Sequence, residues 1–134
     1  MSRVRDAMVS DPLALDVSAS AQEAGQRLSD PGVRAVLVCD SGGALVGVVT
    51  RKTLVREVVA LGRDPATTRL GMIAEPPIFT LDADADLEAA FRELEERDLE
   101  RVPVTEDGRL VGILSRSAVQ RRLAEDEPPV EEAV

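Results

Sequence analysis

The sequence predicts an α+β fold made of two βαββα repeats that pack sheet to sheet. The first observation is a duplicated heptapeptide, LVGVVTR at 45–51 and LVGILSR at 110–116, whose glycines lie 65 residues apart. The second is that apolar segments with strand character alternate with segments of helical periodicity, in the same order in both halves. The third is length, because half of a 134-residue chain is too short to bury both faces of its own sheet.

The first repeat spans about residues 3–62. Ser20 is expected to begin a helix, because its hydroxyl and Glu23 have the spacing of a capping box. Thr50 is expected to cap the last helix, which ends at Gly62. The predicted elements are a helical turn at 4–8, a strand at 13–17, a helix after Ser20, strands at 33–39 and 45–49, and a helix from 51 to 61.

Residues 63–68 are predicted to link the repeats, and the second repeat spans about residues 69–124. It repeats the order of the first, so that residues 1–124 form one module. The predicted elements are a short strand around 78–81, a helix carrying Leu87, Ala90, Phe91 and Leu94, strands at 101–105 and 110–114, and a helix carrying Val119 and Leu123. The acidic segment 125–134 contains two prolines and is predicted to be a disordered tail.

Composition excludes several classes of partner. The formal net charge of −9 repels polyanions, and two Phe are the only aromatic residues, so neither nucleic acid nor a membrane surface is expected as a partner. No segment has the length of an apolar membrane span, and the first ten residues do not resemble a targeting signal. We therefore expect a cytoplasmic protein.

Catalysis is not expected, because the chain lacks the usual chemical groups. It has no His, so the most frequent general base and zinc ligand are missing, and Cys39 is the single cysteine. Cys39 lies in the apolar run AVLVC, which favours a small buried hydrophobe over a reactive thiol. The alternation of Asp82, Asp84 and Asp86 precedes a helix, which favours a helix cap over a metal site.

The two repeats, taken together in chain order, resemble the cystathionine β-synthase (CBS) domain pair. The family pattern is a Met before a Pro, an Ala-bearing helix, an apolar strand that often contains Pro-Val, an acidic-Gly turn, and a Gly-h-h-Thr/Ser-x-x-Asp motif that begins the last helix. Both copies follow this pattern in order. The first copy matches it at Met8, Pro12, Ala24, 36–38, 40–43 and GVVTRKT at 47–53. The second copy matches it at Pro77, Ala89, 102–104, 106–108 and GILSRSA at 112–118.

The resemblance implies pseudo-twofold symmetry and a cleft between the sheets that takes adenosine derivatives. At Thr50 and Ser115, a hydroxyl, the first-turn N–H groups and the positive helix end converge on a point where a phosphate can bind. Arg51 and Arg116 follow these caps and can add a guanidinium. The alternative is an ordinary helix cap followed by a solvated Arg. The resemblance also implies that Arg101, Val102 and Pro103 lie beside the ligand.

Two positions depart from the family pattern. The family's Asp, which accepts hydrogen bonds from the ribose hydroxyls, is replaced by Thr53 in the first copy and by Ala118 in the second. Losing two charge-assisted hydrogen bonds weakens a ribonucleotide by roughly 3 kcal/mol or more. Tight binding of adenine nucleotides is therefore not expected.

We expect a non-catalytic regulatory or sensor module that binds a small anionic ligand. No cofactor is expected, and AMP, ADP, ATP and S-adenosylmethionine are the candidate regulatory ligands. The alternative is a module without ligand that acts as a dimerisation or protein-interaction scaffold. We also expect a homodimer, because the helices after both copies of the motif have more apolar positions than one sheet contact needs. An unidentified regulated protein is the other expected partner.

Overall fold

The computed structural model describes residues 1–77 and 79–126, which form two compact units. The first-repeat unit contains residues 13–77 and 108–110. The second-repeat unit contains residues 1–12, 79–107 and 111–126. Strands and helices occur in both units, so the predicted α+β class is confirmed.

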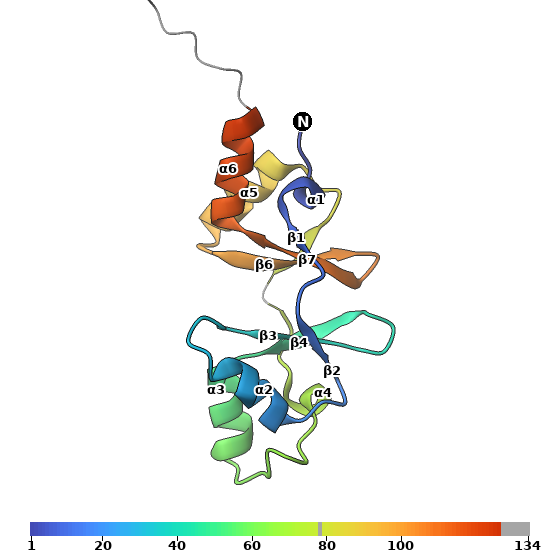
Figure 1. The fold of residues 1–134 in the computed structure, drawn as a ribbon, viewed down its shortest axis with the longest axis vertical. Coiled ribbons are helices and arrows are strands. Elements are labelled where there is room, and N and C mark those ends of the chain that lie inside the picture. Colours follow the sequence, from blue (N-terminus) through green and yellow to red (C-terminus); the bar gives the residue numbers. More distant parts are fainter. Residues whose placement is uncertain (78, 127–134) are drawn as a thin grey trace, which may run out of the picture. The chain divides into compact units, whose positions relative to one another are not determined.

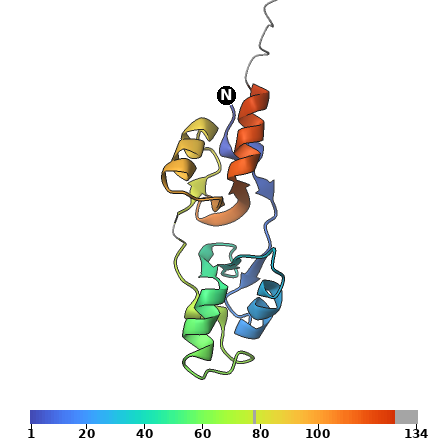
Figure 2. The ribbon, with the colours of Figure 1, turned by 90° about the vertical axis from the view of Figure 1, so that its left-hand side faces the viewer.

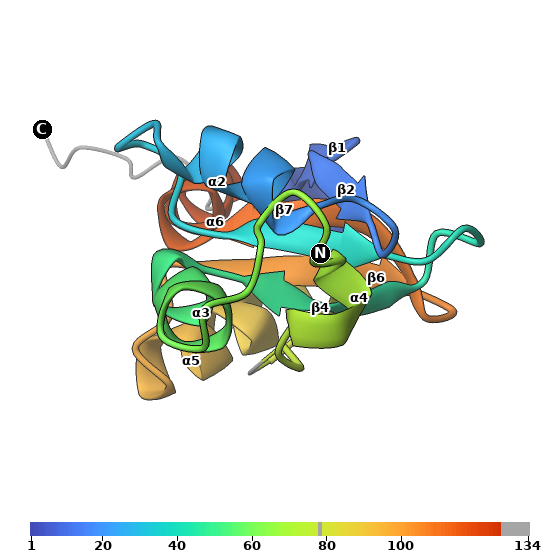
Figure 3. The ribbon, with the colours of Figure 1, turned by 90° about the horizontal axis from the view of Figure 1, so that it is seen from below.

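The first-repeat unit has a three-stranded sheet in the order β2-β3-β4. Strand β2 runs parallel to β3, and β3 runs antiparallel to β4. The helices lie on one face of this sheet (Figure 1), and Figure 3 shows that face with α2, α3 and α4 in front of the strands. The elements are β2 (Ala14–Asp16), α2 (Ala21–Leu28), β3 (Val36–Cys39), β4 (Leu45–Val49), α3 (Arg51–Leu54), a π-helical turn η1 (Val55–Val59) and α4 (Leu70–Ile73).

Aliphatic side chains from the sheet and from the helices form the core of this unit. Ser20 caps α2 as predicted, its hydroxyl accepting a hydrogen bond from the Glu23 backbone N–H at 3.1 Å. The predicted inward face of α2 is confirmed, because Ala24 and Leu28 are buried against the sheet. Gly62 follows η1 with a φ of +67°, a conformation that favours glycine and ends the helix where the sequence predicts.

The second-repeat unit has a four-stranded sheet in the order β1-β7-β6-β5. Strand β1 is antiparallel to β7, and β5 is parallel to β6. Figures 1 and 2 show α1, α5 and α6 on one face of this sheet. The elements are α1 (Val4–Ala7), β1 (Val9–Ser10), β5 (Leu81–Asp82), α5 (Leu87–Glu96), β6 (Arg101–Glu106), β7 (Arg109–Ser115) and α6 (Arg116–Asp126).

The core of the second-repeat unit follows the predicted helical face. Leu87, Ala90 and Leu94 of α5 are buried, and Phe91 packs partly buried against the same cluster. Val119 of α6 is fully buried there. Helices as short as α5 and α6 are held mainly by such packing, because isolated helices shorter than about 12–15 residues are marginal in water.

Two short segments are exchanged between the repeats, one from each. The segment with α1 and β1 begins the first repeat but belongs to the second-repeat unit, where Val4 is fully buried. The segment with α4 begins the second repeat but belongs to the first-repeat unit, where Leu70 and Ile73 are buried. The compact units are therefore offset from the sequence repeats.

The glycines of the duplicated motif lie where these exchanged segments approach most closely. A Cβ at Gly47 would lie 2.6 Å from the Glu75 carbonyl oxygen, and a Cβ at Gly112 would lie 2.6 Å from Met8 Sδ. Val48 and Glu75 exchange two backbone hydrogen bonds at this point, of 2.7 and 2.9 Å. The motif needs glycine here because a side chain would separate each exchanged segment from its strand.

The structure moves several predicted boundaries, and the strand expected at 33–39 begins only at Val36. The strand expected around residues 78–81 is formed by Leu81 and Asp82, while residue 78 lies outside the described residues. The prediction of a disordered tail is wrong for Glu125 and Asp126, which belong to α6. Asp126 is held by the Ser2 hydroxyl and by Arg122, whose Nε lies 3.6 Å from its carboxylate. The rest of the predicted tail, 127–134, lies outside the described residues.

Candidate functional site

Thr50 is the residue on which the candidate site of the first-repeat unit is built. Its hydroxyl accepts a hydrogen bond from the Thr53 backbone N–H at 3.3 Å, so the predicted cap of α3 is confirmed. In return, the Thr53 hydroxyl accepts from the Thr50 backbone N–H at 3.0 Å. The two hydroxyl oxygens lie 3.1 Å apart. Thr53 is only 1% exposed, so its side chain serves the cap and offers no open surface to a ligand.

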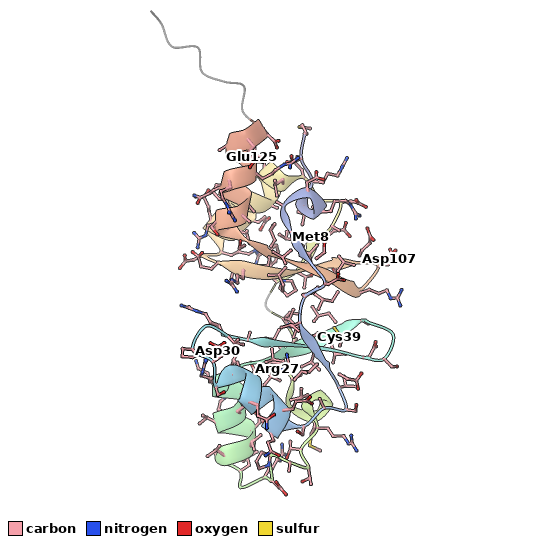
Figure 4. All side chains as sticks on the ribbon, in the orientation of Figure 1. Met8, Arg27, Asp30, Cys39, Asp107 and Glu125 are labelled. Atoms are coloured by element: carbon pink, nitrogen blue, oxygen red, sulfur yellow. The ribbon has the colours of Figure 1, made fainter. Side chains whose placement is uncertain are left out.

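Arg51 is the exposed cation of this cap. Its Nη2 donates to the backbone carbonyl of Asp30 at 2.9 Å, and Asp30 follows the end of α2 (Figure 4). That bond uses one of the five guanidinium N–H donors. The group is therefore anchored beside the start of α3 while its charge stays at the surface.

Ser115 occupies the equivalent position in the second-repeat unit. It is the last residue of β7, and its hydroxyl accepts from the Ala118 backbone N–H at 3.2 Å. The hydroxyl of Ser117 lies 3.4 Å away. The predicted cap is thus present, and Ala118 sits in the first turn of α6 without a polar side chain.

Arg116 differs from Arg51 because its charge already has partners. Its Nη2 lies 2.8 Å from Glu100 Oε1 and 3.4 Å from Asp98 Oδ1. Its side chain is only 20% exposed, and its Nε is buried without a hydrogen-bond partner among the described residues. An anion at this cap must therefore compete with two carboxylates. The sequence analysis did not predict either acidic partner, because whether Glu100 and Asp98 reach Arg116 depends on how the start of β6 approaches α6.

The remaining predicted residues begin strand β6. Arg101 is exposed at the start of the strand, and Pro103 is half-buried. Val102 is 2% exposed and belongs to the hydrophobic core of the second-repeat unit. Its side chain therefore packs in the protein interior.

The structure brings the predicted residues together as two sets, each within its own unit. Thr50, Arg51 and Thr53 form the set of the first-repeat unit, and the other six form the set of the second. Each set has a hydroxyl cap, first-turn N–H groups and an adjacent Arg, a combination that suits an anion. Neither set contains a nucleophile paired with a base.

The first-repeat unit also has an open surface pocket, with a volume of about 590 Å³. None of the predicted site residues lines it. Its lining comes from two short segments, 17–18 and 67–72, which lie apart in the sequence, and the sequence analysis gave no indication of a pocket. The lining residues are Val17, Ser18, Thr67, Arg69, Gly71 and Met72.

Cys39 and the Asp-rich segment are the other candidate groups, and Cys39 is half-buried rather than fully buried as the sequence favours. Burial, with smaller contributions from Asp40 and Asp16, raises the pKa of the Cys39 thiol, so the inert protonated form is stabilised. Asp86 caps α5 by accepting from the Ala89 backbone N–H at 3.0 Å. The described residues contain no cluster of three or more potential metal ligands. Nor does this part of the chain hold a helix long and apolar enough to cross a membrane.

Comparison with known proteins identifies the same repeats. The family model described as "CBS domain" matches residues 4–60 and again residues 70–125. Hypoxic response protein 1 of Mycobacterium tuberculosis is 30% identical over 125 residues, which cover 93% of this chain and 87% of that protein. The chain therefore resembles a protein of similar length over almost its whole extent.

Two solved structures have the same fold. A structure of Hypoxic Response Protein I with two coordinated zinc ions has a TM-score of 0.75 and 29% identity, covering 91% of this chain and 99% of that one. A structure of CBSX2 in complex with AMP has a TM-score of 0.74 and 26% identity, covering 96% and 100%.

Proposed function

This chain belongs to the CBS domain family, and we propose that it is a non-catalytic regulatory module that binds a small anionic ligand at the caps of α3 and α6. The observation that carries this proposal is the recurrence of one arrangement, a hydroxyl cap followed by an Arg, at Thr50-Arg51 and at Ser115-Arg116. The helix N-terminus favours negative charge there, and its backbone N–H groups can bind the oxygens of an anion.

We propose AMP as the first ligand to test, with ADP, ATP and S-adenosylmethionine after it. Support comes from CBSX2, whose structure contains AMP. Recognition of the ribose is the weak part of such a site, because Thr53 is committed to the cap and Ala118 has no polar side chain. Binding therefore depends mainly on contacts to the phosphate.

We do not extend the zinc ions of Hypoxic Response Protein I to this chain. Zinc sites in proteins are built mainly from Cys and His side chains. This chain has no His and one Cys, whose thiol is stabilised in its protonated form.

The second candidate is a scaffold that works without a ligand. The pairing of Arg116 with Glu100 and Asp98 favours it, because these carboxylates already neutralise the cation of the second cap. In both cases we propose a homodimer and an output through an unidentified protein partner. The dimer is supported by Val55, Val59 and Leu61, which are 56%, 71% and 57% exposed on or just after η1.

Calorimetric titration with AMP and with inorganic phosphate tests the ligand proposal. Arg51→Ala is expected to weaken binding of both ligands by roughly 1.5–3 kcal/mol, because it removes a charge-assisted contact to the phosphate. The unfolding temperature without ligand is expected to change little, since Arg51 is exposed and has one hydrogen bond to a carbonyl.

Arg69→Ala is the matched control. Arg69 is also exposed in the first-repeat unit and donates to a backbone carbonyl, that of Ser18 at 3.0 Å, but it lies at the start of α4. The control removes the same charge and is expected to leave both affinities unchanged. Equal losses in the two variants would indicate a non-specific charge effect, and no binding by the wild type would favour the scaffold.

A further inference from the structure

The two caps of the proposed anion site differ in charge at one equivalent position. The matched segments 36–38 and 102–104 relate the two repeats, and two residues before them stand Arg34 in the first repeat and Glu100 in the second. Both residues are exposed and lie just before β3 and β6. The chain therefore reverses the charge of this position between its repeats.

Glu100 contacts the second cap through both its side chain and its backbone. Its carboxylate lies 2.8 Å from Arg116 Nη2, and its carbonyl accepts a hydrogen bond from the Arg116 backbone N–H, also at 2.8 Å. The Ala118 N–H donates to the Ser115 hydroxyl. Two first-turn N–H groups of α6 and the neighbouring guanidinium are thus bonded within the chain. An added anion must compete with the Glu100 carboxylate for the guanidinium, and the negative charge of that carboxylate repels it.

The first cap does not have this internal partner. The register of β3 against β4, continued beyond the two strands, places Arg34 opposite Arg51. Among the described residues, neither of these arginines forms an ion pair, and the Arg51 backbone N–H has no backbone acceptor. Arg51 contacts Asp30 only at its carbonyl, while the Asp30 carboxylate accepts from the Gly32 N–H at 2.9 Å. An anion at the first cap is therefore attracted by two cations.

We propose that the anion binds first at the cap of α3, and that Glu100 is an internal competitor that lowers the affinity of the cap of α6. This inference rests on the proposed function and identifies the residue that makes the two caps unequal. A charge contact at an exposed site changes affinity by up to about fivefold, and the caps differ both at Arg34 and at Glu100, so we expect a difference of about tenfold. The module then fills in two stages as the anion concentration rises.

Titration of the ¹⁵N-labelled wild-type protein with inorganic phosphate tests the difference between the caps. The amides of residues 51–54 report on the first cap, and those of residues 116–119 report on the second. We expect the first group to reach half-saturation at a phosphate concentration about tenfold lower than the second group. Equal midpoints would overturn the inequality and leave the anion site intact. No shift in either group would overturn the proposed function, and this inference with it.

Exchange of the two charges tests whether Arg34 and Glu100 cause the difference. Glu100→Arg is expected to lower the phosphate dissociation constant of the second cap by about fivefold, and Arg34→Glu is expected to raise that of the first cap by about fivefold. A chain with both substitutions is expected to fill the second cap before the first. Glu95→Arg is the matched control, because Glu95 is exposed on α5 and its replacement changes the net charge equally. It is expected to leave the order of filling unchanged.

Glu100→Gln tests the same role with a smaller change. The amide keeps the length of the side chain and removes its charge, so the second cap is expected to gain affinity by less than Glu100→Arg provides. Its unfolding temperature is expected to stay close to that of the wild type, because the Glu100 side chain is 76% exposed. An unchanged midpoint at residues 116–119 in both folded variants would show that Glu100 does not compete with the anion.

Discussion

Leu70→Ala is expected to lower the free energy of unfolding by about 2–5 kcal/mol, the range for removing a fully buried leucine side chain. Leu70 is 0% exposed and packs in the core of the first-repeat unit, although its segment begins the second repeat. Urea unfolding measures the loss. Amide hydrogen exchange is expected to locate it in α2, β3 and β4.

Met72→Ala is the control for this experiment. Met72 lies on the same short helix but is 71% exposed, so its loss is expected to change stability by no more than about 0.5 kcal/mol. Equal effects of the two substitutions would show that α4 does not pack as described. An increase in amide hydrogen exchange confined to β6 and β7 would show that α4 packs in the second-repeat unit.

Ala118→Asp is expected to raise the affinity for AMP by about 10- to 100-fold, the gain from a hydrogen bond to a charged group of roughly 1.5–3 kcal/mol. Position 118 lies in the first turn of α6, where its backbone N–H donates to Ser115. A carboxylate is favoured in the first turn of a helix, so the variant is expected to fold. Calorimetry with AMP measures the gain.

Two comparisons show whether the gain comes from the ribose. Ala118→Asn has nearly the same shape without the charge and is expected to gain much less. For Ala118→Asp, 2′,3′-dideoxy-AMP, which lacks the hydroxyls, is expected to bind no more tightly than it binds the wild type. If neither nucleotide gains affinity, the adenosine site is absent and the scaffold function is favoured.

The local features of the fold were predictable because they depend on neighbouring residues. A hydroxyl or carboxylate followed by an amphipathic segment was sufficient to predict the helix starts at Ser20, Thr50 and Asp86. The buried faces of α2 and α5 followed from helical periodicity. Each of these signals lies within about ten residues of sequence.

The features that were not predicted depend on tertiary contacts. The exchange of the segments containing Val4 and Leu70 leaves the order of elements unchanged, so no pattern within a repeat indicates it. The pairing of Arg116 with Glu100 depends on the approach of β6 to the start of α6. The commitment of the Thr53 hydroxyl to its cap was missed because the sequence does not show whether that hydroxyl faces the backbone or the solvent.

Titration of the ¹⁵N-labelled wild-type protein with AMP, followed by the backbone amide resonances, tests the proposed ligand site most directly. We expect the largest shifts at the first-turn amides of α3 and α6, residues 51–54 and 116–119, because these N–H groups start the two capped helices. The shifts are expected to saturate as AMP is added, and inorganic phosphate is expected to shift the same amides. Unchanged spectra at millimolar AMP, or shifts confined to other parts of the chain, would contradict the proposed anion site.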